Sequence, residues 1–365
     1  MKIEIIREKL LEAVSSAEKV SGKHVALPIL SLIMLEAKGD TLALKATNLD
    51  VGVEVTLPAK ISEEGTLALS GSILKSFLAN IKSKNVVCET EENILKIKTD
   101  EGEVSINTSS AEEFPMIPKI EGEKSWKIGS RDFVSGLNSV LWAASVSTIK
   151  PELSSVFVKE EADDLVFVAT DSFRLAEKKI KSKTARGFDP ILIPFKNALE
   201  IVRIFESYSG ELDIVISKNQ LSITTPTTHL SSRLVDGNFP DYRQIMPKEF
   251  ETKATMLKQD LLQVLKLSSF FADTFNQIII SIMPSKKLMN ISTKNNTVGE
   301  SRQEIKAATE GESVTMPFNH RYVFDCLQSI DSESLVMKIA GAQKPLVISP
   351  ASNSSFTYLI MPMNR

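Results

Sequence analysis

The feature of this sequence that most constrains its fold is a pattern that occurs three times. Three strand-like segments, TLALKATNLD, DLVFVATDSF and LMNISTKNNT, place Thr47, Thr170 and Thr293 at equal intervals of 123 residues. Solenoid proteins repeat at about 20–50 residues, so a much longer interval predicts tandem copies of one whole domain.

Two helical patterns recur with the strands. REKLLEAVSSAEKV, SRDFVSGLNSVLWAA and LKQDLLQVLKLSSFF each follow a short strand-like segment, and Leu261 in the third copy comes five residues late relative to Leu10 and Phe133. Gly71, Pro194 and Pro317, again 123 residues apart, precede the second helical stretch, and such residues are typical of helix starts. Two apolar sets stay in register on one face of this second helix: Leu78, Ile201 and Phe324, and Ile81, Ile204 and Leu327.

Each unit is therefore expected to run strand, helix, strands, helix, strands. Short turns such as KGD and EADD join the strands, which favours an α+β domain with an antiparallel sheet. Boundaries near Glu123 and Phe250 predict three domains, over residues 1–123, 124–250 and 251–365.

The distribution of charge is uneven although the total is small. The whole chain has a formal net charge of −3, whereas the six expected helices together carry +6, which leaves −9 for the remainder. One interpretation is an ordinary solvated helix face with mixed charge. The other is that the helices share a surface that faces an anion such as the phosphates of a nucleic acid, which would be bound without reading its sequence.

Several kinds of chemistry lack a motif in this sequence. There is no phosphate-binding GxxxxGK[ST] loop, no GxGxxG and no GxSxG, and the three histidines have no metal-ligand spacing. We therefore expect no cofactor and no bound metal. The two cysteines, Cys88 and Cys326, lie in apolar stretches and are expected to be buried thiols of a cytosolic protein. Neither a signal peptide nor a membrane span is evident, so no membrane association is expected.

The most distinctive local motif is VATDSFRLA, residues 168–176. It permits two interpretations from the residues alone. It can be a surface turn that presents Arg174 beside Leu175, or a purely structural turn in which the Asp171 side chain caps the backbone.

In combination, VATDSFRLA, RLVDGNFPDYRQIMP, LPILSLIMLE and the terminal YLIMPMNR resemble the beta subunit of bacterial DNA polymerase III, the sliding clamp. The resemblance runs along the whole chain. It implies a DNA-clamp fold in which two protomers form a homodimeric ring of six domains, with the helices inside and the antiparallel sheets outside. It implies a processivity factor for DNA replication, not an enzyme, whose partners are double-stranded DNA, the catalytic subunit of DNA polymerase III, a clamp loader, and other polymerases and repair proteins.

The resemblance also implies three sets of site residues. The expected DNA-facing set is Lys19, Lys23, His24, Lys75, Lys82, Lys84, Lys150, Lys196, Arg203, Lys266 and Arg321. A groove for short linear peptides is expected from Leu153, Thr170, Arg174, Leu175, Pro240, Gln244, Ile245, Ile360, Met361, Pro362 and Met363, with Phe173 and Gln244 as departures from some family members. The ring joint is expected to use Val104, Ile106, Phe270 and Phe271, where two core phenylalanines are the alternative.

Two other functions stay open from the sequence. One is an enzyme with a site at a domain junction, formed by Asp171, Arg174 and Asp241. The other is a monomeric peptide-binding scaffold that does not meet DNA. The apolar tail YLIMPM adds an expectation of its own: Tyr358 to Ile360 should form a final strand that Pro362 ends, leaving Met361 and Met363 at a surface groove.

Overall fold

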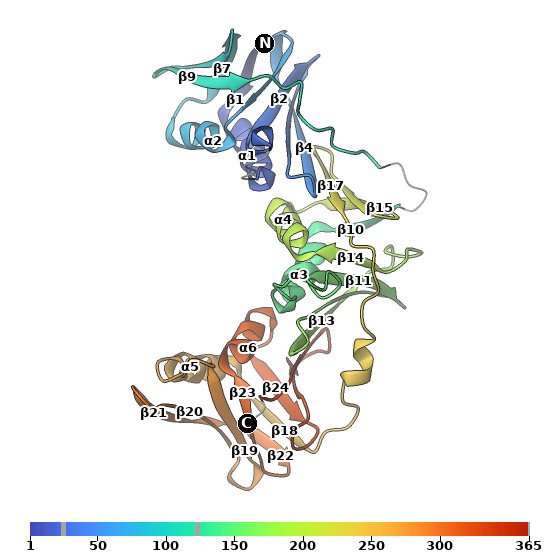
Figure 1. The fold of residues 1–365 in the computed structure, drawn as a ribbon, viewed down its shortest axis with the longest axis vertical. Helices are drawn as coiled ribbons and strands as arrows, with labels where there is room; N and C mark the ends of the chain where they lie inside the picture. The colour runs from blue at the N-terminus through green and yellow to red at the C-terminus, as the bar shows by residue number, and fades with distance from the viewer. Residues whose placement is uncertain (23–26, 121–124, 364–365) are drawn as a thin grey trace. The chain divides into compact units, whose positions relative to one another are not determined.

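The structure is a computed structural model, and it describes residues 1–22, 27–120 and 125–363 (Figure 1). Lys23, His24 and the predicted boundary at Glu123 lie outside the described residues. The described chain repeats one order of elements three times, namely a strand, a helix, a group of strands, a second helix and three further strands. The expected α+β unit is therefore confirmed.

The first repeat contains two helices and nine strands: β1 (Lys2–Ile6), α1 (Arg7–Val20), β2 (Ile33–Lys38), β3 (Thr41–Thr47), β4 (Val51–Pro58), β5 (Lys60–Glu63), β6 (Gly65–Leu69), α2 (Gly71–Asn80), β7 (Asn85–Glu91), β8 (Ile94–Thr99) and β9 (Gly102–Ser109), with a 3-10 turn η1 (Pro28–Ser31) after α1. The second contains β10 (Ser125–Gly129), α3 (Ser130–Val140), η2 (Leu141–Ala143), β11 (Ser155–Glu161), β12 (Asp164–Thr170), β13 (Arg174–Lys181), β14 (Ile191–Pro194), α4 (Phe195–Phe205), β15 (Glu211–Ser217), β16 (Gln220–Thr224), β17 (Thr228–Arg233) and η3 (Tyr242–Ile245).

The third repeat follows the same plan: β18 (Thr252–Leu257), α5 (Lys258–Ser269), β19 (Gln277–Met283), η4 (Pro284–Lys286), β20 (Leu288–Asn295), β21 (Gly299–Lys306), β22 (Ala308–Gly311), β23 (Val314–Asn319), α6 (His320–Asp325), η5 (Cys326–Ser329), β24 (Ser334–Ile339), β25 (Leu346–Pro350) and β26 (Phe356–Ile360). The tail expectation is confirmed in that β26 forms and ends before Pro362.

The chain forms two compact units that do not coincide with the repeats. The N-terminal unit comprises Met1–Val134, Thr184–Phe188 and Leu199–Leu234, and the C-terminal unit comprises Ser135–Lys183, Asp189–Ala198 and Val235–Arg365. The N-terminal unit contains one 13-stranded sheet, in which β17 of the second repeat pairs with β4 of the first. The C-terminal unit contains a 9-stranded sheet, in which β26 of the third repeat pairs with β13 of the second, and a 4-stranded sheet.

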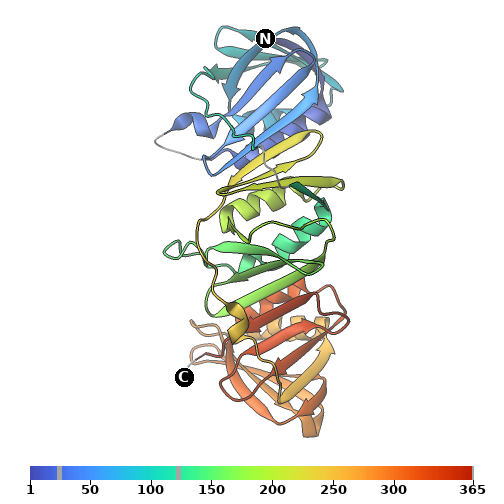
Figure 2. The same ribbon diagram turned by 90° about the vertical axis from the view of Figure 1, so that its right-hand side faces the viewer.

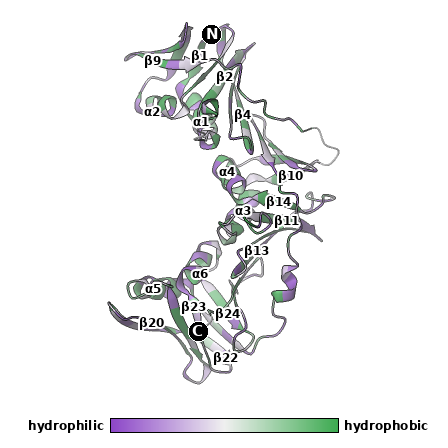
Figure 3. Ribbon diagram, in the orientation of Figure 1, coloured by the Kyte–Doolittle hydropathy of each residue, from purple (hydrophilic) through white to green (hydrophobic). Residues whose placement is uncertain are grey.

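Within each unit the helices pack on one face of the sheets, and the strands lie in front of them in the view of Figure 2. The helices are amphipathic, with apolar and polar residues interspersed along each one (Figure 3). In α1 the buried side chains Leu10, Val14 and Ala17 recur at helical spacing, so they form one stripe toward the sheet. Burial of such a stripe, and not helix propensity, supplies most of the stability of short helices.

The repeat register holds at the first two hairpins and shifts at the third. In the turns after β3 and β12, the Asn48 and Asp171 side chains each accept hydrogen bonds from the backbone N–H groups two and three residues later. Asn295 does the same in the third repeat, so the interval there is 124 residues. Thr293 is therefore not the counterpart of Thr47 and Thr170, and the expected equal spacing is wrong at this position.

The predicted helix starts are also partly wrong. Helix α2 begins at Gly71 and α4 begins directly after Pro194, both as expected, but Pro317 lies within β23. Helix α6 begins at His320, because the Asn319 side chain accepts hydrogen bonds from the backbone N–H groups of Arg321 and Tyr322 and so caps the helix. A polar cap fixes the start of this helix, which the proline signal misplaces by three residues.

Candidate functional site

Two segments of the predicted groove lie side by side in the C-terminal unit. Arg174 at the start of β13 pairs directly with Ile360 at the end of β26. Beyond the strand, the Met361 backbone N–H donates to the Phe173 carbonyl at 2.8 Å, and that of Met363 donates to the Pro317 carbonyl at 2.9 Å. The hairpin and the tail are thus joined by a continuous ladder, although 186 residues separate Arg174 from Ile360 in the sequence.

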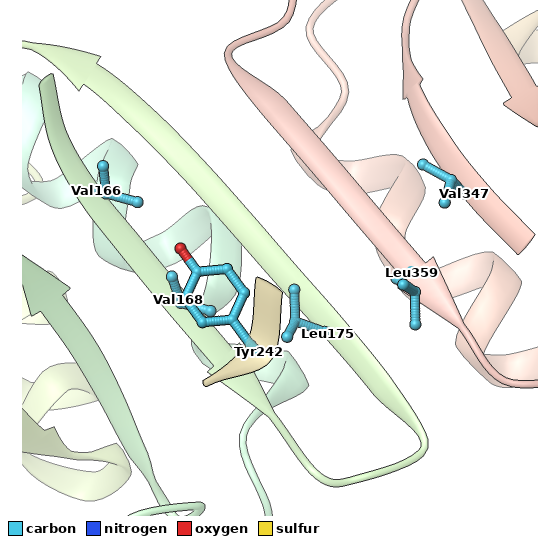
Figure 4. Close-up of a cluster of buried hydrophobic side chains, with 6 residues drawn as sticks. All are labelled: Val166, Val168, Leu175, Tyr242, Val347 and Leu359. Atoms are coloured by element: carbon cyan, nitrogen blue, oxygen red, sulfur yellow. The ribbon is translucent and has the colours of Figure 1, made fainter. Parts of the chain in front are cut away.

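The third segment of the predicted groove crosses the same sheet. Tyr242 of η3 packs into an apolar cluster formed by Val166, Val168, Leu175, Val347 and Leu359 (Figure 4). Its hydroxyl donates to Glu177 Oε2 at 2.6 Å, and burial together with this carboxylate raises the pKa of Tyr242. Tyr242 therefore anchors the stretch from Pro240 to Ile245 onto the outer face of the joined sheet.

The predicted groove residues divide into exposed and buried groups. Ile245 is 48% exposed and Met361 is 36% exposed, so both can contact a partner directly. The exposed or half-buried remainder is Pro240, Gln244, Pro362 and Met363. Leu153, Thr170, Leu175 and Ile360 are buried, so they support the groove from below.

Arg174 forms the polar centre of this region. Its Nε donates to Asp171 Oδ2 at 2.9 Å, Nη1 donates to Asp325 Oδ2 at 2.7 Å, and Nη2 donates to the Trp142 carbonyl at 2.8 Å. The guanidinium also lies over the Tyr322 ring, 4.5 Å from its centroid. Burial alone would lower the pKa of Arg174, but Tyr358, Asp325 and Asp171 raise it above the ordinary value.

The structural interpretation of VATDSFRLA is therefore confirmed, whereas the turn does not present Arg174 and Leu175 at the surface. Asp171 caps the turn as an Asx motif, with its Oδ1 accepting from the Phe173 and Arg174 backbone N–H groups at 2.9 and 3.0 Å. The same carboxylate orients Arg174, whose side chain is only 12% exposed and bridges to α6. Asp241, the third member of the alternative enzyme site, instead accepts a hydrogen bond from Gln244 Nε2 at 3.0 Å.

Sequence reasoning named Phe173 only as a departure from some family members, and it missed the aromatic residues Tyr322 and Phe275. Phe173 is 62% exposed at the tip of the hairpin, and Phe275 is 71% exposed. The Asn319 amide donates to the Phe275 carbonyl at 3.5 Å, which places Phe275 beside the start of α6, the helix that carries Tyr322. A polar flank around Phe275, in ADTFNQ, was the available signal, because large apolar residues in polar loops are seldom core residues.

The predicted DNA-facing cations differ in how they are engaged. Lys75 binds Glu18 at 3.0 Å, Arg203 binds Glu200 at 3.1 Å, and Lys19 donates to the Arg203 carbonyl. Lys266 and Arg321 line one hollow between α5 and α6. Six of the predicted DNA-facing cations have no ion-pair partner among the described residues, namely Lys82, Lys84, Lys150, Lys196, Lys266 and Arg321. Lys82 and Lys84 follow the end of α2 at Asn80.

Three of the four residues predicted for the ring joint, Val104, Ile106 and Phe271, lie in or beside two strands with largely unpaired edges, β9 and β21. Val104 and Ile106 belong to β9, which pairs with β8 along its length but with β6 only at Thr108 and Ser109. Phe270 caps the end of α5 and is 72% exposed, so it is not a core residue. Phe271 is half-buried beside Gly299, the first residue of the edge strand β21.

Other chemistry in the described part of the molecule is sparse. No group of three or more histidine, cysteine, aspartate or glutamate side chains there could hold a metal ion. Cys88 and Cys326 are both buried free thiols, as expected, and burial raises the pKa of Cys88 to about 12. Within those same residues, no helix has the length and apolar character needed to span a membrane.

Comparison with solved structures defines the class. A DNA polymerase sliding clamp from Bacillus subtilis shares 25% sequence identity and superposes with a TM-score of 0.93, covering 100% of this chain and 99% of the other. The DNA polymerase III beta subunit of Thermotoga maritima shares 24% identity with a TM-score of 0.94 over the same shares of the two chains. The fold is thus that of a three-domain clamp protein.

The sequence comparison identifies the family. Models of the N-terminal, central and C-terminal domains of the DNA polymerase III beta subunit match residues 1–118, 127–241 and 243–364. The beta sliding clamp of Staphylococcus epidermidis is 24% identical over 100% of this chain and 99% of its own length. This chain belongs to the DNA polymerase III beta subunit family.

Proposed function

We propose that this protein is a DNA sliding clamp that encircles duplex DNA without sequence specificity and tethers a replicative polymerase. The full-length match of all three repeats to sliding clamps carries the proposal. The protein acts in the cytoplasm as a homodimer and performs no catalysis of its own. Its partners are the catalytic subunit of DNA polymerase III, a clamp loader, and other polymerases and repair proteins that dock through short peptides.

Contact with DNA rests on helix-side cations that read no bases. Exposed lysines without carboxylate partners, such as Lys82 and Lys84, are free to exchange counterions for phosphates. By contrast, Lys75 and Arg203 are held by Glu18 and Glu200, which reduces their contribution. Weak and sequence-blind contacts of this kind suit a protein that must slide along its substrate.

The internal repeats supply a register for the ring joint. Where β17 meets β4, Leu230 lies opposite Val53, and where β26 meets β13, Tyr358 lies opposite Ala176. Strand pairing inside each repeat identifies the residue of β9 that corresponds to Leu230 and Tyr358. Leu230 lies opposite Ile223 and Tyr358 lies opposite Ile348. In the first repeat Val104 lies opposite Ile97, the equivalent isoleucine, so Val104 is the counterpart. The same pairing makes Ser301 of β21 the counterpart of Val53 and Ala176.

The open edges β9 and β21 are therefore proposed to pair antiparallel between protomers, with Val104 opposite Ser301 of the other copy. This register sets Glu103 opposite Arg302, two exposed residues of opposite charge. It also sets Ile106 opposite Gly299, next to which Phe271 packs. The joint thus accounts for the predicted interface residues and adds a charge pair to them.

A charge swap tests this register. Glu103→Arg and Arg302→Glu should each weaken the dimer two- to fivefold, as expected for one exposed charge pair, and the double variant should restore it. The dissociation constant of each variant is measured by analytical ultracentrifugation. Equal weakening by the single and double variants would show that these residues do not face each other.

The peptide groove is proposed to take an extended partner segment across the hairpin and the tail. Met361, Pro362 and Met363 supply adaptable apolar contacts, and Phe173, Ile245 and Phe275 supply exposed apolar area around them. Arg174, with its donors already engaged, positions the hairpin against α6. Gln244 stands at the rim and contributes to peptide preference.

Topological retention tests the function as a whole. The labelled protein is loaded onto a nicked circular plasmid with a clamp loader and ATP, and bound protein is separated from free protein by gel filtration. We expect the protein to co-elute with the circular DNA and to be released when a restriction enzyme linearises it. Retention on linear DNA would indicate ordinary binding, and binding to neither form would favour the monomeric scaffold.

A further inference from the structure

The outer face of the four-stranded sheet in the third repeat contains a hollow of about 350 Å³. Ile279 in this hollow is 39% exposed, although it lies in the middle of strand β19. We call this feature the third-repeat hollow; its lining is Gln277, Ile279, Ser292, Thr293, Lys294, Glu300, Ser301 and Arg302. None of these residues belongs to the peptide groove.

Strand register shows that the hollow has a counterpart in each of the other repeats. In every repeat a row of three directly opposed residues crosses the three equivalent strands. The rows are Met34, Lys45 and Glu54 in the first repeat, Phe157, Val168 and Glu177 in the second, and Ile279, Ser292 and Arg302 in the third. The three surfaces are therefore the same surface repeated.

In the first two repeats, the chain itself covers the start of this row with a Phe-Pro segment. The Phe239 ring stacks on Phe157 with centroids 4.7 Å apart and an interplanar angle of 3°. In the first repeat Phe114 and Pro115 line one hollow together with Met34. The equivalent position in the third repeat, Ile279, has no such cover among the described residues.

The covering segments make a second contact three to five residues further on, with the acidic end of the row. The Tyr242 hydroxyl donates to Glu177, and Lys119 Nζ binds Glu54 at 3.1 Å. Between the two contacts in the first repeat, Ile117 packs so closely on Gly52 that an added Cβ would lie 2.9 Å from its Cγ2. Each cover thus combines an aromatic anchor with a donor for a carboxylate.

The third row ends in a cation where the other two end in a carboxylate. Arg302 takes the place of Glu54 and Glu177, and Lys294 lines the same hollow. Within the described chain neither side chain has an ion-pair partner. The same face of β20 also contains Asn290, which is 3% exposed and whose amide nitrogen and oxygen both lack a hydrogen-bond partner there.

We propose that the third-repeat hollow is a second docking site, distinct from the peptide groove, for an extended acidic segment of a partner protein. An aromatic residue of that segment stacks on Ile279, and a carboxylate three to five residues later binds Lys294. Arg302, which the proposed ring joint pairs with Glu103 of the other copy, adds positive charge beside it. The chemistry is that of the two covers already present in the molecule, with the charge of the second contact reversed. The proposal goes beyond the clamp function and requires neither DNA nor a loader.

Synthetic peptides test the proposal on the full-length protein. The probe has the sequence of residues 237–244, GNFPDYRQ, with the change Tyr242→Glu, and the matched control carries Phe239→Ala as well. Binding is measured by isothermal titration. We expect the probe to bind and the control to bind at least tenfold more weakly, because loss of a buried aromatic anchor dominates such contacts.

Protein variants locate the site. Ile279→Asp should weaken probe binding at least tenfold, and Lys294→Glu should weaken it two- to fivefold. Ile149→Asp, at an isoleucine of the same unit that is 88% exposed, is the control and should leave binding unchanged. Circular dichroism and light scattering of each variant verify the fold and the mass.

Three outcomes would overturn the proposal. Equal probe affinity for the wild type and Ile279→Asp would show that the probe binds elsewhere. Equal affinity for the probe and the control peptide would show that the aromatic residue does not contribute to binding. A shift of Ile279→Asp to monomer would assign the hollow to the contact between copies. Failure of the sliding-clamp proposal would appear separately, as loss of retention on circular DNA with peptide binding intact.

Discussion

Arg174 Nη1 donates to Asp325 Oδ2 at 2.7 Å, and the two residues are 151 positions apart in the sequence. This ion pair ties the hairpin between β12 and β13 to α6, the second helix of the third repeat. The Trp142 indole adds a parallel link, because its Nε1 donates to Ser329 Oγ at 3.1 Å, and that hydroxyl donates to the Ser139 carbonyl at 2.9 Å. Polar side chains thus join the helices of the second and third repeats. The ladder between β13 and β26 joins the sheets of the same two repeats.

Replacing Arg174 with alanine should lower the free energy of unfolding by about 1–3 kcal/mol, because Asp171 and the Trp142 carbonyl lose a partner while mostly buried. Asp325 is 38% exposed, so water compensates that carboxylate and keeps the loss at the lower end. Urea unfolding followed by circular dichroism measures the change. Lys60→Ala, which removes the exposed ion pair with Glu4, is the control and should cost less; equal losses would refute a special role for Arg174.

Glu200 should make stability fall with rising pH. Burial, opposed by Arg203 and Lys19, raises the pKa of its carboxyl above the ordinary value, and Oε2 has no hydrogen-bond partner among the described residues. The unfolded chain therefore releases this proton at a lower pH than the folded protein does, and stability declines from the unfolded pKa to the folded one. Glu200→Gln should remove this decline and stabilise the protein at pH 7 by up to about 1 kcal/mol, as thermal melts between pH 4 and pH 8 can show.

Charge reversal at Lys82 and Lys84 should weaken loading onto DNA and flatten its dependence on salt, with little effect on folding. Both residues are exposed and lie after the end of α2. Loading is measured at several salt concentrations. Lys75→Glu is the comparison, and it should disturb loading less per charge because Glu18 already neutralises Lys75. Unchanged loading of the double variant at every salt concentration would argue against a DNA-facing position.

Phe270→Ala should weaken the dimer at least tenfold, because this ring is 72% exposed in one protomer and would be buried at the proposed joint. Phe275→Ala removes a ring that is 71% exposed elsewhere and should leave the dimer intact. Light scattering across a dilution series reports the mass. Phe271→Ala should also favour the monomer, but with a loss of stability, since this side chain is half-buried in its own repeat.

Deleting residues 361–365 should leave a folded dimer that no longer binds partner peptides. The deletion removes the backbone bonds from Met361 to Phe173 and from Met363 to Pro317 but spares β26, which is paired on both sides. A family-type peptide rich in glutamine, leucine and phenylalanine is titrated into both proteins by calorimetry. If both bind it with equal affinity, the tail only packs and does not form a binding site.

The sequence predicted the repeated unit well because apolar alternation and helical spacing are local signals that three copies reinforce. It misplaced the start of α6, where Asn319 caps the helix, and missed the one-residue shift at Asn295, because capping and turn contacts depend on backbone geometry. Of the groove, the strand Phe356–Ile360 was predictable from its apolar pattern. That Leu175 and Ile360 are buried while Phe173 and Phe275 are exposed was not, because it depends on pairing between strands of different repeats.

The pairing of repeats through strands has a consequence for assembly. Each joint inside the chain pairs two different strand edges, β17 with β4 and β26 with β13. The proposed joint between copies pairs their counterparts, β9 of one copy with β21 of the other. Such a connection is directional and can in principle be extended indefinitely, since every added copy offers a fresh β21 edge. The chemistry of the joint therefore does not determine how many copies assemble. The number of copies is instead a matter of geometry, because a head-to-tail contact forms a ring only where its rotation closes and an open filament where it does not.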